Sequence, residues 1–200
     1  MAGSLKPEND FVAKHWQRIP EWQLAAGFLP EASRTLQLDY LALQNEWWLA
    51  RAIADETPRL AKLSWWAEEL RGWSRGMRRH PLGVQLYSAS GRWSAVADAL
   101  TQDSTQMLVN ALSEVDAEIL GIATPSASLQ RIVAMETALL ETDETADWPS
   151  KRSRESEPLS RLRAMQHSIL AARYAKSRRT VALSPLRALL ISWNAARKSK

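Results

Sequence analysis

The sequence contains no cysteine, and this absence excludes disulfide bonds, thiolate catalysis and zinc sites with cysteine ligands. Histidine is scarce as well: His15, His80 and His167 lie far apart, without the short spacings of a typical zinc site. A chain without cysteine suits a reducing compartment. We therefore expect a cytoplasmic protein with neither a disulfide framework nor a zinc centre.

Long apolar runs are also missing. The opening MAGSLKPENDF has no apolar core of the kind that a secretory signal needs, and no segment approaches the roughly 20 apolar residues of a membrane span. With 46% apolar and 24% charged residues, the composition is that of an ordinary globular domain. Ten tryptophans are unusual, and they favour either a bulky core or a pocket lined with aromatic side chains.

Acidic residues are nearly absent from the C-terminal quarter of the chain. Residues 151–200 hold 13 of the 26 Lys and Arg but 2 of the 22 Asp and Glu, a net charge of +11, whereas residues 1–150 carry −7. The basic residues, Arg173 among them, predict a solvated face or an acidic protein partner, with peripheral association with a membrane surface as the next alternative. Nucleic acid is disfavoured, because nucleic-acid modules interleave aromatic side chains and this basic part has only Tyr174 and Trp193.

Helical periodicity runs through nearly all of the chain, and the fold class that it predicts is all-α, as one helical domain over residues 1–200. A helix from Pro30 to about Asp55 is apolar on nearly every side, which is typical of a buried helix. Pro58 disfavours helix at Thr57, so a break is predicted there. Further helices are predicted at 59–76, 91–101, 104–121, 128–142, 159–178 and 185–197.

Polar residues mark the ends of several of these helices. Asp103 or Ser104, and Ser126 or Ser128, are the residues that we expect to cap two of them. The segment 142–158, TDETADWPSKRSRESEP, is polar and contains two prolines. It is predicted to be a loop or hinge that precedes the basic C-terminal region 159–200.

One stretch of the chain resembles the squalene/phytoene synthase family. Residues 59–82, RLAKLSWWAEELRGWSRGMRRHPL, are similar to a helix of that family that ends in Gly and leads through a short basic stretch to His-Pro-Leu. The positions that carry the resemblance are Arg59, Leu60, Trp66, Glu69, Leu70, Gly76, His80, Pro81 and Leu82. The preceding helix, with Arg34, Tyr40 and the run LALQNE, is similar to the family's first long helix. The resemblance covers roughly residues 11–100.

The resemblance implies an isoprenoid-synthase-like helical bundle around a large apolar cavity, here shortened at its C-terminal side. Catalytic members of the family join two prenyl diphosphates head to head. Two aspartate-rich motifs on facing helices hold Mg²⁺, which neutralises the departing diphosphate. Carboxylates four residues apart lie on one helix face and supply the hard oxygen ligands that Mg²⁺ prefers.

The first aspartate-rich motif is missing from this sequence. The positions for its aspartate pair hold Arg51 and Ala52 in one register and Trp47 and Trp48 in the other, and none of these side chains ligates Mg²⁺. The sequence thus predicts no metal site on the first long helix, and Mg²⁺ is a cofactor only if activity remains.

A second carboxylate cluster is a weak candidate for metal binding. Its members Asp143, Glu144 and Asp147 have a suitable spacing but lie in a polar stretch at a helix C-terminus, where negative charge is unfavourable. We therefore expect a solvated acidic loop there. Glu114 and Glu118 are also four residues apart, but Asn110, Ser113 and Asp116 around them indicate an exposed face.

No catalytic residue is assigned, but eight side chains are candidates for lining a pocket: Tyr40, Asn45, Glu46, Trp48, Arg51, Arg59, Trp65 and Glu69. Asn45 and Glu46 stand where catalytic relatives carry aspartates, and non-catalytic relatives, including one associated with assembly of respiratory complex I, have a similar Asn-Glu stretch. The alternative for this pair is a buried interhelical hydrogen bond. For Glu69 the alternative is a surface pairing with Lys62.

These features predict a catalytically degenerate relative of squalene/phytoene synthases that binds an isoprenoid or lipid-like ligand or a protein partner. Two alternatives remain open at this point. One is an active Mg²⁺-dependent head-to-head prenyltransferase. The other is a protein whose basic surface binds anionic lipid or nucleic acid.

Overall fold

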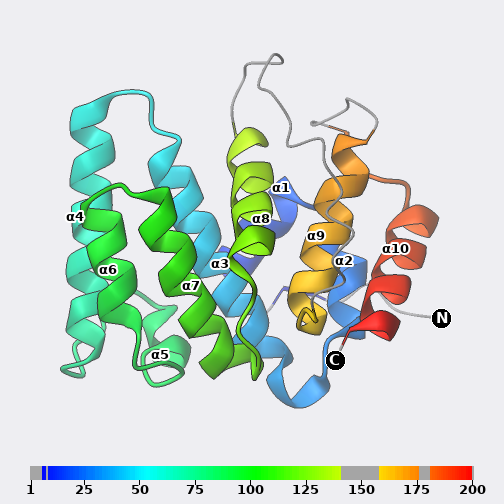
Figure 1. Cartoon of the computed structure of the whole chain (residues 1–200), viewed down its shortest axis with the longest axis horizontal. Coiled ribbons are helices and arrows are strands. Elements are labelled where there is room, and N and C mark those ends of the chain that lie inside the picture. Colours follow the sequence, from blue (N-terminus) through cyan, green and yellow to red (C-terminus); the bar gives the residue numbers. More distant parts are fainter. Residues whose placement is uncertain (1–5, 8, 141–157, 176–180, 200) are drawn as a thin grey trace.

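The computed structural model describes residues 6–7, 9–140, 158–175 and 181–199, and these residues form an all-α structure (Figure 1). The prediction of an all-α class is therefore confirmed. The longer helices are α1 (Asp10–Arg18), α3 (Arg34–Arg51), α4 (Glu56–Trp73), α6 (Trp93–Thr101), α7 (Thr105–Leu120), α8 (Ser126–Ala138), α9 (Arg161–Tyr174) and α10 (Pro185–Lys198). Shorter turns of helix are α2 (Trp22–Ala25), α5 (Gly83–Leu86) and the 3₁₀ turns Ala26–Phe28 and Glu31–Ser33.

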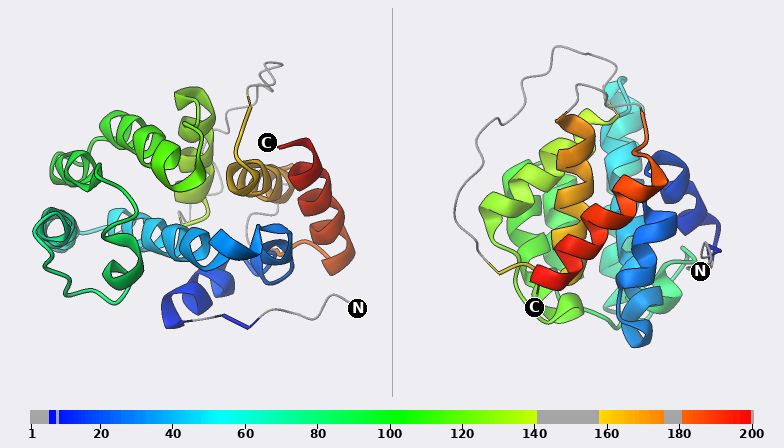
Figure 2. Two further views of the ribbon diagram at one scale, coloured as in Figure 1. Left: turned by 90° about the horizontal axis from the view of Figure 1, so that it is seen from below. Right: turned by 90° about the vertical axis from the view of Figure 1, so that its right-hand side faces the viewer.

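The other helices are arranged around α3, which runs through the middle of the bundle (Figure 2). Neighbours in sequence pack on one another: α4 on α6, α6 on α7, α7 on α8, α8 on α9 and α9 on α10. Helix α10 also packs on α2, and α1 packs on α3. Helices that follow one another in sequence are thus neighbours in space, and α4 and α10 lie at opposite ends of the molecule (Figure 1).

Helix α3 is buried on nearly every side, as its sequence predicts. Its core side chains include Leu38, Leu41, Leu43, Trp47 and Trp48. Polar side chains of the same helix, from Asp39 to Glu46, are buried as well. Because buried polar groups require hydrogen-bond partners, α3 is the element from which an interior polar site can be built.

The predicted helix break at Thr57-Pro58 is wrong. Helix α4 begins at Glu56 and includes both residues, and the chain turns just before it, with Asp55 in extended conformation. Proline is tolerated in the first turn of a helix, because the N–H that it lacks has no partner within the helix. The break is therefore set by residues 52–55, and Pro58 strengthens the start of α4.

The two capping predictions have different outcomes. Ser104 caps α7, since its side chain accepts a hydrogen bond from the Met107 N–H at 3.3 Å. The capping prediction for Ser126 or Ser128 is wrong: α8 begins at Ser126 after Pro125, without a side-chain capping bond. The extended backbone of Pro125 ends the preceding turn without one.

The core is filled largely by tryptophan. The largest fully buried side chains include Trp22, Trp47, Trp66 and Trp73, and Arg163 is among them too. In the described part of the chain, no helix is both long enough and apolar enough to cross a bilayer. Most of the predicted hinge 142–158, with Asp143, Glu144 and Asp147, lies outside the described residues.

Candidate functional site

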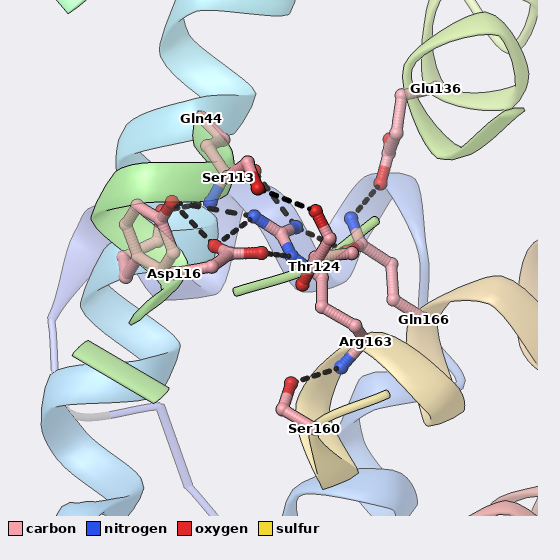
Figure 3. Close-up of polar contacts among 9 residues, drawn as sticks. Gln44, Ser113, Asp116, Thr124, Glu136, Ser160, Arg163 and Gln166 are labelled. Atoms are coloured by element: carbon pink, nitrogen blue, oxygen red, sulfur yellow. Dashed lines mark hydrogen bonds and ion pairs between the residues drawn. The ribbon is translucent and has the colours of Figure 1, made fainter. Parts of the chain in front are cut away.

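A network of buried polar side chains lies in the interior and is centred on Arg163 of α9 (Figure 3). The Arg163 guanidinium donates to Asp116 of α7 through Nε and through Nη2, both at 2.8 Å. The Tyr40 hydroxyl of α3 donates to the same carboxylate at 2.8 Å. Arg163 Nη1 donates to the side-chain oxygens of Gln44 at 3.0 Å and Gln166 at 2.6 Å. One cation thus joins α3, α7 and α9.

A second buried ion pair continues this network toward α1. Glu136 of α8 accepts a hydrogen bond from Gln166 Nε2 at 2.9 Å and pairs with Arg18 of α1. Arg18 Nε also donates to the Asn45 side chain of α3 at 2.7 Å. Glu136 and Gln166 therefore connect the two ion pairs into one chain of contacts through the middle of the bundle.

Charge states in the network are fixed by these contacts. Burial alone would raise the pKa of Glu136, but the Arg18 cation beside it lowers that pKa below its ordinary value. Burial, and next the Asp116 carboxylate, raise the pKa of Tyr40, so its hydroxyl stays protonated and remains a donor. Burial would lower the pKa of Arg163, yet Asp116 raises it overall. These shifts favour the ionised forms of Glu136 and Arg163 and the neutral form of Tyr40.

His15 of α1 lies at the edge of the network and is neutral. Burial, followed by the nearby Arg18 cation, lowers the pKa of its imidazole from 6.5 to about 4. The ring lies 6.2 Å, centroid to centroid, from the Trp22 indole. His15 is therefore a buried titratable group whose protonation the fold opposes.

A third buried ion pair connects the C-terminal part of the chain with its N-terminal part. Arg173 of α9 lies 3.6 Å from Glu21 through Nε and donates to the Arg18 carbonyl at 3.0 Å through Nη1. Both Arg173 and Glu21 are buried. The prediction that Arg173 belongs to a solvated or partner-binding face is therefore wrong, because this cation neutralises an internal carboxylate.

The predicted exposed face around Glu114 and Glu118 is also wrong at one position. Asp116 has no exposed surface and is the main acceptor for Arg163. Glu114 and Glu118 do lie at the surface, where both are near Arg92. Helical geometry explains the difference, since Asp116 is turned by about 200° from Glu114 and points inward.

The eight pocket candidates lie in three parts of the structure. Two of these eight side chains belong to the buried network. Tyr40 and Asn45 are the members that contact Asp116 and Arg18. Glu46, next to Asn45, lies nearer the surface and pairs with Lys14 at 2.7 Å. Trp48 is buried in the apolar core. The same buried helix, α3, therefore supplies both polar contacts and apolar packing.

Arg51 and Arg59 meet at the C-terminal end of α3. Both guanidiniums reach Asp103 in the turn between α6 and α7, at 3.0 Å for Arg51 and 3.5 Å for Arg59. Arg51 also donates to Thr105 at 2.7 Å. These two candidates close the end of the bundle and lie apart from the Arg163 network.

Glu69 and Trp65 of α4 form the third group, beside the His80 turn. Glu69 is buried and accepts hydrogen bonds from the Trp73 indole at 2.9 Å, from the N–H groups of Arg79 at 2.8 Å and His80 at 2.9 Å, and from Arg79 Nε at 3.0 Å. The alternative of a surface pairing with Lys62 is wrong, because these donors occupy the carboxylate. Lys62 instead lies over the Trp65 ring, 5.0 Å from its centroid.

The described carboxylates do not fit a two-motif Mg²⁺ site. Asp116, Glu136 and Glu21 are each paired with an arginine, which competes with a metal ion for the same oxygen atoms. Within the described ranges, no group of three His, Asp or Glu side chains has the geometry to hold a metal ion. Asp143, Glu144 and Asp147 lie outside these ranges, so their metal-binding role stays a prediction.

A hollow of about 490 Å³ opens at the surface beside the Glu69 group, and it is lined by Glu68, Glu69, Arg71, Gly72, Arg75, Met77 and Arg79. Two of its cations are engaged within the protein: Arg79 with Glu69, and Arg71 with Asp98 at 2.8 Å. These pairings leave little unbalanced charge for recognising an ion.

Sequence reasoning missed the centre of the network: Arg18, Asp116, Glu136, Arg163 and Gln166. A usable signal exists in α9, where Arg163 and Gln166 lie three residues apart among the buried Leu162, Met165 and Ile169. Polar side chains at core-facing positions of a helix need partners on neighbouring helices.

Comparisons of the chain with family models, with curated proteins and with solved structures found no match.

Proposed function

We propose that this chain is a non-catalytic binding protein on a helical scaffold that resembles the squalene/phytoene synthase family. The observation that supports this proposal is the arginine pairing of its interior carboxylates, above all Asp116 with Arg163 and Glu136 with Arg18. Prenyl transfer requires carboxylates that are free to hold Mg²⁺ against a diphosphate. Carboxylates held by bidentate or buried guanidinium contacts serve the fold instead.

The contents of the interior favour a partner at the surface over a ligand in the centre. Four fully buried tryptophans and the Arg163 network occupy the bundle. An isoprenoid chain placed beside Arg163 would separate buried charges from their partners, which is costly in a low-dielectric environment. The binding function therefore belongs to the outer surface of the helices.

Activity measurements test the first part of this proposal. Purified chain is incubated with Mg²⁺ and farnesyl or geranylgeranyl diphosphate, and both diphosphate release and C30 or C40 products are measured. We expect neither. Mg²⁺ with inorganic diphosphate is likewise expected to leave the melting temperature unchanged, since within the described residues no group of three His, Asp or Glu side chains could hold the ion.

Formation of a C30 or C40 product would overturn the proposal. The double variant Asp143→Asn, Asp147→Asn would then be the informative comparison. Loss of product in that variant would assign metal binding to the acidic cluster and support the active prenyltransferase. Retained product would place the metal site elsewhere.

A further inference from the structure

Helix α10 carries a row of exposed apolar side chains. Leu186, Leu190 and Trp193 are 69%, 52% and 46% exposed, respectively. Steps of four and three residues place them on one face of the helix. Val181, which precedes the helix, is also exposed, at 54%. A contiguous exposed apolar face on one helix indicates an interaction surface.

The opposite face of α10 holds it on the bundle. Its small side chains Ala188, Ser192, Ala195 and Ala196 are buried, and the helix packs on α9 and α2. Figure 2, right, looks onto α10 at the end of the molecule, with no other helix outside it. The apolar row therefore lies on the outer surface, on a helix that the fold already supports.

The charged residues of the C-terminal part that carries this row are all basic. Residues 158–200 contain no Asp or Glu. On α10 itself, Arg187 lies between Leu186 and Leu190 in sequence, and Arg197 and Lys198 follow Trp193 in the last turn. The Arg197 guanidinium lies over the Trp193 ring, 4.8 Å from its centroid. Unlike Arg163 and Arg173, these cations have no ion-pair partner among the residues that the structure describes.

We propose that α10 docks on an anionic lipid surface. Leu186, Leu190 and Trp193 enter the interface between headgroups and acyl chains, and Arg187, Arg197 and Lys198 lie at the level of the lipid phosphates. Apolar residues with Trp on one face and cations beside them are typical of helices that lie in the plane of a membrane. Tryptophan suits this depth because its ring is apolar and its N–H is polar.

Two other occupants fit the surface less well. A second copy of the chain would bring like charges together without any acidic residue of α10 between them. A protein partner needs about 800 Å² on each side, whereas the three side chains expose on the order of 300 Å². A lipid surface needs only apolar insertion and attraction of the cations by anionic headgroups.

Vesicle binding of the full chain tests the proposal, which rests on the surface-binding function proposed above. Co-sedimentation is measured with vesicles of phosphatidylcholine alone and with vesicles containing 30% phosphatidylglycerol (roughly a physiological anionic fraction). We expect binding to the anionic vesicles, weakened by added salt. Equal binding to both vesicles, or binding that salt does not change, would overturn the proposal.

Substitutions of α10 side chains outside its buried face localise the binding and leave the core intact. Leu190→Gln with Trp193→Gln should weaken anionic-vesicle binding at least about tenfold. Arg187→Gln, Arg197→Gln and Lys198→Gln together should weaken it about a hundredfold, since each cation contributes a factor of about five. The matched controls are Leu60→Gln and Arg75→Gln on and beside α4, at the other end of the molecule. Equal losses in the controls would contradict the assignment to α10.

Two further results would assign the face to a different occupant and overturn the lipid proposal. One is a dimer in light scattering that Leu190→Gln with Trp193→Gln dissociates. The other is a chain that ignores vesicles yet binds an acidic amphipathic peptide through the same residues. Prenyltransferase activity would contradict the non-catalytic proposal alone, so the two failures are distinguishable.

Discussion

Arg163 and Asp116 make two hydrogen bonds of 2.8 Å to one another, across 47 residues of sequence, at a place where neither side chain has any exposed surface. This bidentate geometry is the strongest that a guanidinium and a carboxylate can form. Tyr40, Gln44 and Gln166 use the remaining hydrogen-bonding capacity of the pair. The pair is thus a fixed structural element that defines the position of α9.

Removing one charge of this pair should be far more costly than the pair's net contribution to stability. Asp116→Asn leaves the Arg163 cation buried without a counter-ion, and we expect a loss of about 3–5 kcal/mol in the free energy of unfolding. Urea denaturation followed by far-UV circular dichroism measures it. Glu114→Gln, at an exposed position of the same helix, is the control and should cost less than about 0.5 kcal/mol.

A double variant separates pairing from simple loss of packing. Asp116→Leu with Arg163→Met removes both charges, so the stability lost should be well below the sum of the two single losses. Some loss remains, because Tyr40 and Gln44 keep polar atoms that have then lost their partners. Additive single losses would contradict the pairing.

Glu69 should stabilise the turn that leads to His80. Burial alone would raise the pKa of Glu69, but hydrogen bonds from the His80 N–H, the Trp73 indole and Arg79 together lower it. A carboxyl whose folded-state pKa is depressed stabilises the fold above its unfolded-state pKa, and that contribution disappears as pH falls through the folded-state value. Glu69→Gln should therefore cost about 2 kcal/mol at pH 7 and make stability less sensitive to acid.

The neighbouring residue provides the control for Glu69. The Glu68 side chain is 65% exposed and lies 3.9 Å from Arg79, so Glu68→Gln should change stability little at any pH. Urea unfolding of both variants at pH 7 and below pH 4 provides the comparison. A similar pH profile for the two variants would argue against an anchoring role for Glu69.

His15 should make the fold sensitive to mild acid. Its pKa is about 4 in the folded chain, against 6.5 when unfolded, so the unfolded state binds more protons between these values. Stability therefore falls as pH drops from about 6.5 toward 4, by up to roughly 3 kcal/mol. His15→Gln should flatten this part of the profile. An NMR titration of the imidazole with a midpoint near 6.5 would refute the prediction.

Gly83 should tolerate no side chain. A Cβ added there would lie 2.9 Å from Nε1 of Trp73, the atom that donates to Glu69. Because the indole is buried and held by that hydrogen bond, Gly83→Ala should cost about 1–3 kcal/mol through overpacking. Gly91→Ala, where the added Cβ meets nothing within 4 Å, is the matched control. Thermal unfolding of both variants measures the difference.

The helices were predictable because their signals are local. Apolar periodicity placed α3 and α4 within a few residues, and Ser104 marked the start of α7. The break before α4 was misplaced because Pro58 was expected to exclude helix at Thr57. Pro58 instead lies in the first turn of α4, where proline is tolerated. The short α1 was not separated from its surroundings, since Asn9, its capping residue, has no long apolar stripe after it.

The candidate site was less predictable because its contacts are distant in sequence. Asp116 has the polar residues Ser113, Glu114 and Glu118 near it in sequence, and these neighbours indicated an exposed helix face. Its partner Arg163 lies in the C-terminal region 159–200, whose excess of Lys and Arg indicated a solvent-exposed face. Only the packing of α7 against the rest of the bundle makes the two residues meet, and a single sequence does not encode that meeting locally.

The buried arginines of α9 set a condition on how the protein is made. The residues of α7, and Glu21 before α2, are synthesised earlier than α9. During synthesis Glu21 and Asp116 therefore lack their ion-pair partners Arg173 and Arg163. A polypeptide released before residue 163 would have to keep Asp116 hydrated or protonated, and either choice opens the middle of the bundle. We therefore expect chains that end before Arg163 to be cleaved by proteases more readily than the full sequence, because Asp116 then lacks the cation that pairs with it in the interior.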